Sequence, residues 1–323
     1  MPRQPRIEFA GACYHVLNRG NYRQDLFTVG SAGQRFETTL FEACGRYGWR
    51  LHAYVLMSNH YHAALETAEP NLTTGMQWLQ STFANRFNRA VRQRGHVFQG
   101  RYKSLLIEDS AALLSVVNYI HLNPVRAGLV SVAHLPDYAL SSFPKFLWRR
   151  GRRPPCLTAT DWLWEAGGLK PTLAGMRCYQ GYLAHREEAD PARREELYGR
   201  LCRGWYIGTR EGKRSLVLDK LATRSSKPAS TQRRLYGEDA AEALLHKGLG
   251  CLRRAKADLQ RDRKGAKWKV ILACWIRQQT GISNRWLAEH VHLGAATGVS
   301  RLLQNERRRP LQRDPLWRKL TKC

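Results

Sequence analysis

Two histidines, His60 and His62, stand one residue apart in a segment rich in aromatic and aliphatic side chains. On a β-strand, residues i and i+2 point to the same face, so the two imidazoles would lie about 6–7 Å apart. That spacing suits two ligands of one divalent ion, whereas Tyr61 between them would pack on the opposite face. Taken alone, two histidines on a strand are more often structural than metal-binding.

A second pair, Tyr119 and Asn123, stands four residues apart in a segment with helical periodicity. Positions i and i+4 share one helix face, so a phenol and an amide would be presented together. A tyrosine on such a helix is usually a core residue. If the helix meets the His-x-His strand, however, a metal ion can polarise a phosphodiester while Tyr119 attacks it as a covalent nucleophile. Asn123 would add a neutral third ligand. Mg²⁺ or Mn²⁺ suits phosphate chemistry, with two imidazoles favouring Mn²⁺.

The elements that must position these residues follow from the hydrophobic pattern. We expect strands over residues 13–19, 49–57, 60–67 and 104–108, and helices over residues 31–47, 72–94 and 111–122. Asn123-Pro124 is expected to end the last helix. The order strand, helix, strand, strand, helix, strand, helix is the ferredoxin-like order with one helix added. It predicts an α+β fold, with helices on one face of an antiparallel sheet.

Motif residues occur in three stretches, Gly11–Gly20, Met57–His62 and Asn118–Gly128, and in a fourth, Phe98–Ser104. In this order and spacing they resemble the single-tyrosine HUH transposases, and most of all the REP-associated tyrosine transposases. The resemblance implies a divalent metal held by His60 and His62, with Asn123 as a third ligand, and no nucleotide cofactor. It also implies that Tyr119 attacks single-stranded DNA beside a hairpin of a palindromic repeat and leaves a 5′-phosphotyrosine.

Two other functions stay open: a non-catalytic DNA-binding or regulatory protein on the same fold, and an HUH replication initiator. The four residues His60, His62, Tyr119 and Asn123 favour the enzyme, because a binding protein has no need of all four. The initiator is disfavoured because the chain lacks a tyrosine pair and a P-loop motif.

Basic side chains near these motifs are candidates for DNA contact. They are Arg19, Arg86, Arg89, Arg101, Lys103 and Arg126. Such residues can track a phosphate backbone, although a run of charges is usually just a solvated face. His15 lies on the same expected strand as Arg19 and could face the site, with a structural role as the alternative.

The charge of the chain also favours a nucleic acid partner. Its 323 residues include 53 Lys and Arg against 26 Asp and Glu, a formal net charge of +27. Such an excess favours a polyanion, although it can also serve solubility. Residues 1–150 carry +8 and residues 151–323 carry +19. Neither a signal peptide nor a membrane-length apolar run is present, so we expect a cytoplasmic, nucleoid-associated protein with no membrane partner.

The length of the chain suits several domains. We expect the HUH transposase domain over residues 1–148, a basic, mostly helical linker region over residues 149–265 and a helix-turn-helix module over residues 266–323. Helices are expected over residues 267–279, 284–291 and 297–304, and the segment from Ile282 to Leu302 resembles the helix-turn-helix of the replication initiator DnaA. The module would add duplex DNA as a partner, through Ser300 and Arg301 on the recognition helix. A small bundle that only packs is the alternative. A monomer and a homodimer both stay open.

Overall fold

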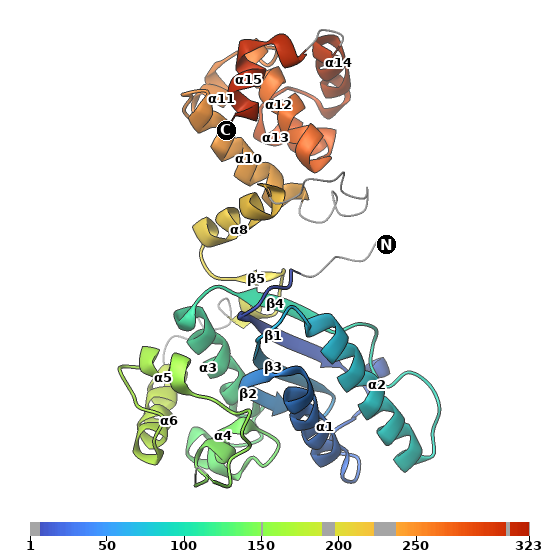
Figure 1. Cartoon of the computed structure of the whole chain (residues 1–323), viewed down its shortest axis with the longest axis vertical. Helices are drawn as coiled ribbons and strands as arrows, with labels where there is room; N and C mark the ends of the chain where they lie inside the picture. The colour runs from blue at the N-terminus through green and yellow to red at the C-terminus, as the bar shows by residue number, and fades with distance from the viewer. Residues whose placement is uncertain (1–6, 150, 189–197, 223–236, 308–310, 323) are drawn as a thin grey trace. The chain divides into compact units, whose positions relative to one another are not determined.

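The computed structural model describes residues 7–149, 151–188, 198–222, 237–307 and 311–322 (Figure 1). The chain divides into two compact units, one that ends at Gly208 and one that begins at Thr209. Each unit is described by itself. None of the helices in these ranges is long and apolar enough to cross a membrane.

The first unit is built around a five-stranded sheet in the order β2-β3-β1-β4-β5. Its strands are β1 (Ala12–Arg19), β2 (Trp49–Leu56), β3 (His60–Thr67), β4 (Lys103–Ile107) and β5 (Tyr206–Ile207). Neighbours among the first four strands pair antiparallel, with Leu17 opposite His62, whereas β5 runs parallel to β4. The first four strands begin and end within one residue of the expected positions. The two-residue strand β5 is an addition that the sequence pattern does not predict.

Helices cover both faces of this sheet (Figure 1). α1 (Ala32–Tyr47) and α2 (Leu72–Val91) pack on the face that carries Tyr61, whose ring centroid lies 4.7 Å from that of Phe36. α3 (Ser110–Arg126) packs on the opposite face, against His62. The expectation that all helices lie on one face is therefore wrong. β2 and β3 are buried at nearly every position, so both of their faces need a cover.

The helix α3 is longer than the sequence predicts. It does not end at Asn123 but continues through Pro124 to Arg126. Pro124 has no N–H to donate to the carbonyl four residues earlier, so the helix gives up one hydrogen bond there and still continues. The Ala127 N–H closes the helix end by donating to the Asn123 carbonyl at 3.0 Å. Asn123 therefore lies inside the helix, one turn after Tyr119.

The remaining helices of the first unit extend its core beyond α3. They are η2 (Val132–Asp137), α4 (Ser142–Phe146), α5 (Thr160–Glu165) and α6 (Leu173–Glu188). The buried ring of His121 joins them, with Nε2 2.9 Å from the Ser142 hydroxyl and Nδ1 3.2 Å from the Tyr179 hydroxyl. Trp162 and Tyr179 are fully buried. The first compact unit thus extends to Gly208, past residue 149, where the composition predicts the start of a linker region.

The described part of the second unit is helical. Its elements are α8 (Arg210–Ala222), α10 (Gly237–Cys251), α11 (Asp258–Arg261), α12 (Lys267–Thr280), α13 (Asn284–His290), α14 (Ala296–Arg307), η3 (Leu311–Arg313) and α15 (Pro315–Thr321). An apolar core that includes Trp268, Trp275 and Trp286 holds them together. Short turns join α12, α13 and α14, and these helices lie close to their expected ranges.

A buried lysine supports the turn between α13 and α14. The Lys269 ammonium donates hydrogen bonds to the main-chain carbonyls of Leu259 at 2.9 Å, Asp262 at 3.3 Å and His292 at 2.8 Å. Three carbonyl acceptors compensate for the removal of this charge from water. Lys269 therefore ties the loop before α12 to the turn after α13.

Candidate active site

Three histidines and Tyr119 meet between the sheet and α3. The ring centroid of Tyr119 lies 5.2 Å from that of His62 and 5.8 Å from that of His15. The ring of His60 lies 5.3 Å from that of His62. All except His60 are buried. The structure thus places His60, His62 and Tyr119 together and adds His15 from β1.

A chain of hydrogen bonds sets which nitrogen of His62 carries its hydrogen. His15 Nδ1 lies 2.8 Å from the Leu201 carbonyl oxygen, which can only accept, so Nδ1 must carry the hydrogen of a neutral ring. His15 Nε2 is then an acceptor, and His62 Nδ1 donates to it at 3.0 Å. Consequently His62 Nε2 carries a lone pair. A fixed tautomer of this kind is what partners of metal-binding histidines provide.

The tautomer of His60 is also set by its hydrogen bonds. The Asn59 amide nitrogen donates to the Arg23 carbonyl at 3.1 Å, so the amide oxygen is the atom that faces His60 Nδ1, 2.9 Å away. His60 Nδ1 therefore donates, and its Nε2 also keeps a lone pair. Both histidines of the His-x-His strand offer the same nitrogen as a potential ligand.

Burial keeps these imidazoles neutral. It lowers the pKa of His15 to about 4, and burial together with the charge of Arg19 lowers the pKa of His60 to about 4. Burial, with His15 and His60 as neighbours, holds the pKa of His62 well below its usual range. A neutral imidazole is the form that binds a metal ion, so all three are competent near neutral pH.

The hydroxyl of Tyr119 lies where a phenolate is disfavoured. Burial and the adjacent Cys202 raise the pKa of Tyr119 above its usual value, while Asn123 and Arg126 oppose this rise. The Asn123 amide nitrogen donates to the Tyr119 carbonyl at 2.9 Å, which holds the amide beside the tyrosine. The phenol is therefore neutral in this arrangement, and a cation is needed to stabilise charge on its oxygen.

Residues 198–207, which we call the covering segment, lie over Tyr119. The ring centroid of Tyr198 is 5.3 Å from that of Tyr119, and Cys202 Sγ is hydrogen-bonded to Tyr119 Oη at 3.1 Å. The end of the segment forms β5 and pairs with β4. As a result, Tyr119 is only 7% exposed.

The covering segment also supplies a potential metal ligand. Ligand atoms of His15, His62 and Cys202 lie within 4.8 Å of one another. This group differs from the expected set of His60, His62 and Asn123, although it shares His62 with that set. A thiol and two imidazoles favour softer ions than Mg²⁺.

Three of the expected DNA-contact residues border the site. The Arg126 guanidinium carbon lies 5.3 Å from the ring centroid of Tyr119 and 4.2 Å from that of Tyr198. Burial raises the pKa of the Cys202 thiol, and the charges of Arg126 and Lys103 oppose that rise. Arg19 is the third, because its charge helps to lower the pKa of His60 and of His62. These cations give the site a positive potential that favours a phosphate group.

The other candidates of the first unit lie elsewhere. Arg86 is engaged between α2 and α1, where its guanidinium lies 2.8 Å from the Glu42 carboxylate and donates to the Thr39 hydroxyl at 2.8 Å. Arg89 is also on α2, the helix that covers the face away from Tyr119, and it is exposed. Arg101 is exposed in the chain before β4.

The two candidates on α14 differ from each other. Arg301 is exposed. The Ser300 hydroxyl accepts a hydrogen bond from the Asn284 amide at 2.8 Å, and the Asn284 oxygen accepts one from Arg277 at 2.6 Å. Ser300 therefore joins α13 to α14, which leaves Arg301 as the better placed of the two for DNA.

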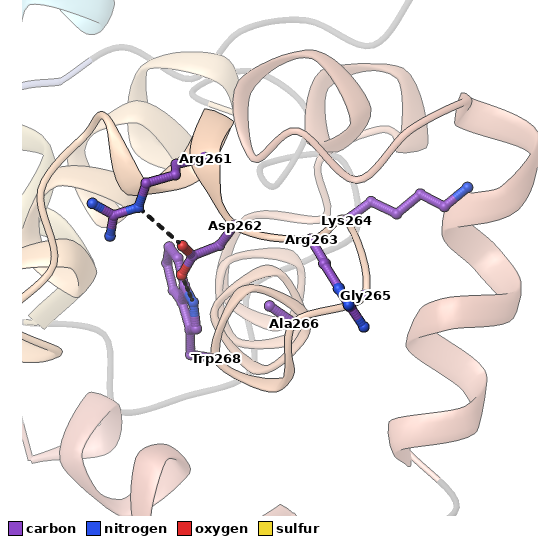
Figure 2. A pocket seen from close by; sticks show the side chains of 7 residues that line it. All are labelled: Arg261, Asp262, Arg263, Lys264, Gly265, Ala266 and Trp268. Atoms are coloured by element: carbon purple, nitrogen blue, oxygen red, sulfur yellow. Dashed lines mark hydrogen bonds and ion pairs between the residues drawn. The ribbon is translucent and has the colours of Figure 1, made fainter.

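A basic hollow of about 850 Å³ opens in the second unit (Figure 2). Its lining residues are Arg261, Asp262, Arg263, Lys264, Gly265, Ala266 and Trp268. The one carboxylate among them, Asp262, accepts a hydrogen bond from the Trp268 indole at 3.0 Å and lies 3.5 Å from Arg261 Nε. Figure 2 shows Lys264 extending away from this group. The hollow is a second cationic surface, separate in sequence from the Tyr119 site.

Sequence reasoning missed Cys202 and left His15 open. The register of β1 holds the signal for His15, because this residue lies two positions from Leu17, which pairs opposite His62. Side chains two residues apart share a sheet face. Cys202 has no local signal, since it reaches the site from far along the chain.

The comparisons with known proteins concern the N-terminal half of the chain. A family model described as "Transposase IS200 like" matches residues 9–123. A REP-associated tyrosine transposase of Haemophilus influenzae is 25% identical over 119 residues, which cover 33% of this chain and 66% of that protein, just under two thirds of its length. A solved structure, "Structure of the REP associates tyrosine transposase bound to a REP hairpin", is 22% identical, with a TM-score of 0.38, and the match covers 50% of this chain and 91% of that one. The residues matched by the family model include His60, His62, Tyr119 and Asn123, and they end before the covering segment.

Proposed function

Because a family model described as "Transposase IS200 like" matches residues 9–123, we propose that the chain cuts and rejoins single-stranded DNA with Tyr119 as the nucleophile. One observation carries the proposal. The Tyr119 ring lies 5.2 Å from His62, in a site where His60 and His62 each keep a lone pair on Nε2. A structural pair of histidines has no need of matched tautomers next to a tyrosine.

The residues present fit a divalent ion. Two neutral imidazoles and the amide oxygen of Asn123 would form a ligand set for Mn²⁺ or Mg²⁺, and Asn59 and His15 hold His60 and His62 in the binding tautomer. When bound, the ion would polarise the scissile phosphodiester and stabilise negative charge at the reacting oxygens.

The side chains of the site then have distinct roles. Tyr119 Oη attacks the phosphorus and loses its proton, the bond from phosphorus to the 3′ oxygen breaks, and this oxygen takes up a proton. A 5′-phosphotyrosine remains, and attack on it by a 3′ hydroxyl rejoins a strand without a nucleotide cofactor. Arg126 is placed to bind phosphate oxygens, since its guanidinium lies over the Tyr119 ring. His15 positions His62.

The covering segment must leave Tyr119 before DNA can react. The hydroxyl is hydrogen-bonded to Cys202, and Tyr198 lies against the ring, so a phosphate has no access to Oη in the covered arrangement. Displacement of the segment would also remove burial and Cys202 from the tyrosine, and both raise the pKa of Tyr119.

We propose that the substrate is single-stranded DNA beside a hairpin of a palindromic repeat. The motif resemblance and the name of the Haemophilus influenzae relative support this choice. The strand order β2-β3-β1-β4 supports a ferredoxin-like core. Residues 266–323 would contact duplex DNA through Arg301, as in a helix-turn-helix module.

A covalent adduct tests the proposed reaction. The full chain is incubated with an end-labelled single strand that contains a hairpin, in the presence of Mn²⁺, and the products are separated under denaturing conditions. We expect a labelled protein–DNA adduct that Tyr119→Phe abolishes. Tyr198→Phe is the matched control, because this second tyrosine lies at 5.3 Å and should not be required.

Two results would count against the mechanism. An adduct that survives Tyr119→Phe but is lost with Tyr198→Phe would move the nucleophile to the covering segment. Hairpin binding without any adduct would favour the non-catalytic, regulatory protein instead.

A further inference from the structure

We propose that His15, His62 and Cys202 form a second metal site, which takes a thiophilic divalent ion such as Zn²⁺ and holds Tyr119 in its covered arrangement. The three ligand atoms lie within 4.8 Å of one another, and His15 and His62 are buried. The site stands on this geometry alone. Only its inhibitory effect rests on the proposed function of Tyr119.

The ligand chemistry selects zinc over magnesium. Two imidazoles and one thiolate are a preferred donor set of Zn²⁺, whereas Mg²⁺ prefers oxygen. His15 Nε2 and His62 Nδ1 are 3.0 Å apart. With zinc–nitrogen bonds of about 2.0–2.1 Å, an ion can replace the hydrogen that the two rings now share. Tyr119 Oη, 3.1 Å from Cys202 Sγ, is in reach of the fourth position.

The surroundings already orient these ligands. His15 Nδ1 donates to the Leu201 carbonyl at 2.8 Å, and metal-binding histidines commonly hold a backbone carbonyl in this way. Leu201 is the residue next to Cys202. A metal at this site would therefore fix the covering segment at two adjacent residues.

Zinc binding would release one proton, from the Cys202 thiol, and would move another on the His62 ring. Zn²⁺ binds Cys202 as the thiolate, and the thiol proton is released to solvent. The hydrogen on His62 Nδ1 moves to Nε2, which frees Nδ1 for the ion. An imidazole that carries hydrogen on Nε2 has no lone pair there. The zinc site and the proposed catalytic site therefore exclude each other through one ring, and zinc binding both covers Tyr119 and removes a ligand from the catalytic ion.

Cobalt spectroscopy tests the site without any need for activity. Metal-free full-length protein is titrated with Co²⁺, which binds zinc sites and shows a near-ultraviolet charge-transfer band when a thiolate is a ligand. We expect one equivalent to give this band and Zn²⁺ to displace it. Cys202→Ser should lose the band, whereas Cys178→Ser, which removes an exposed thiol on α6, should keep it. Calorimetry of the wild type in several buffers should show about one proton released per Zn²⁺ bound, as thiol deprotonation requires.

The effect on the reaction is measured separately. Each protein is assayed for the Mn²⁺-dependent adduct with rising Zn²⁺, relative to its own zinc-free value. We expect zinc to inhibit the wild type and Cys178→Ser alike, with at least about 100-fold more zinc needed for Cys202→Ser, since even an outer partner of a metal ligand is worth 10–100-fold in affinity.

Absence of a thiolate band in the wild type, or its persistence in Cys202→Ser, would overturn the proposed zinc site. Equal inhibition of the wild type and Cys202→Ser would overturn its inhibitory role. A thiolate band in a protein that never forms an adduct would support the metal site and contradict the proposed function, so the two failures are distinguishable.

Discussion

The two nitrogens of the His62 ring face different partners. Nδ1 donates to His15, and Nε2 keeps a lone pair next to His60. The position of a single hydrogen on this ring therefore decides which ion it can bind. Burial keeps the His62 ring neutral. A neutral ring has one nitrogen with hydrogen and one with a lone pair, so the tautomer decides which nitrogen can bind an ion.

The lowered pKa values predict how metal binding depends on pH. His15 and His60 each have a pKa of about 4, so protons compete with a metal ion only as the pH approaches that value. We expect the Mn²⁺ affinity of the full chain, measured by calorimetry, to change by less than about threefold between pH 7.5 and 5.5. Two imidazoles of ordinary pKa would lose about 100-fold over this range. A loss of that size would show that His60 and His62 titrate normally.

The lowered pKa values of the histidines also determine how the stability of the first unit depends on pH. Buried histidines with a lowered pKa stay neutral while those of the unfolded chain take up protons. The stability that they contribute is complete above about pH 6.5 and is lost as the pH falls toward 4. The first unit should therefore unfold more easily in this window, as followed by thermal melting.

We predict that Tyr22 contacts a DNA base. Its side chain is 90% exposed, on the turn η1 (Asn21–Arg23), where both Tyr22 and Arg23 have positive φ angles. Such a backbone is strained for these residues and is held by its surroundings, here by the Asn59 amide that also orients His60. An exposed aromatic ring beside an active site is a stacking platform for an unpaired base.

Replacement of Tyr22 should weaken binding of single strands. Stacking of one base is worth about 1–3 kcal/mol, so Tyr22→Ala should lower affinity for a single-stranded hairpin flank by about 5–150-fold, measured by fluorescence anisotropy. Tyr22→Phe should bind like the wild type. Trp164→Ala, which removes another exposed aromatic side chain, is the control. If both alanine variants bind equally well, Tyr22 does not stack.

The sequence predicts the residues that lie in regular elements better than those that reach the site from elsewhere. The spacing of His60, His62, Tyr119 and Asn123 is local, and two periodicities suffice to place each pair. Cys202 depends on the path of the chain through β5, which no local pattern encodes. For Ser300 the position on the helix predicts a DNA contact, but it does not reveal that the Ser300 hydroxyl already accepts a hydrogen bond from Asn284.

At the scale of elements, the contacts of Lys269 predict how firmly the turn between α13 and α14 is held. Lys269→Ala would leave the carbonyls of Leu259, Asp262 and His292 without this donor. Buried groups that lose their partner cost about 1–3 kcal/mol each. We expect the unfolding transition of the second unit to fall by several degrees in a thermal melt of the full chain.

Lys264→Ala is the matched control for this experiment. Its side chain is exposed and borders the basic hollow, so its loss should leave the melting temperature unchanged. A Lys269→Ala variant that melts with the control would show that water replaces the ammonium group.

Most element boundaries follow from sequence because amphipathic periodicity is local. The exceptions have physical causes. α3 continues past Pro124, where the Ala127 N–H still bonds the Asn123 carbonyl, although a proline usually interrupts a helix. β5 has two residues, too few to show alternation, and its existence depends on the free edge of β4. Helices cover both faces of the sheet because β2 and β3 are buried at nearly every position.

At the scale of the whole chain, the net charge of +27 predicts steep salt dependence of DNA binding. Each phosphate contact releases a counterion, and six to ten contacts would reduce affinity about 10³–10⁵-fold between 50 and 200 mM salt. We expect a linear fall of log affinity against log salt for a hairpin probe. The yield of adduct at saturating protein should change far less, because covalent chemistry follows binding. A flat salt profile would mean that the charge serves solubility.

The division of the chain was the hardest property to predict. A basic, proline-containing stretch near residue 150 has the composition of a boundary, yet the compact unit continues to Gly208. Composition marks where a chain is exposed, and an exposed loop can lie within a unit as well as between units. Trp162 and Tyr179, both fully buried, are the residues that return this stretch to the core.

The covering segment also sets an order in time. Cys202 follows Tyr119 by 83 residues. A ribosome that adds about 5–20 residues per second completes the helix of the proposed nucleophile roughly 4–17 seconds before it makes the residues that cover it. The residues of α3 therefore exist before the covering segment does, and Tyr119 can be covered only after that segment has been made.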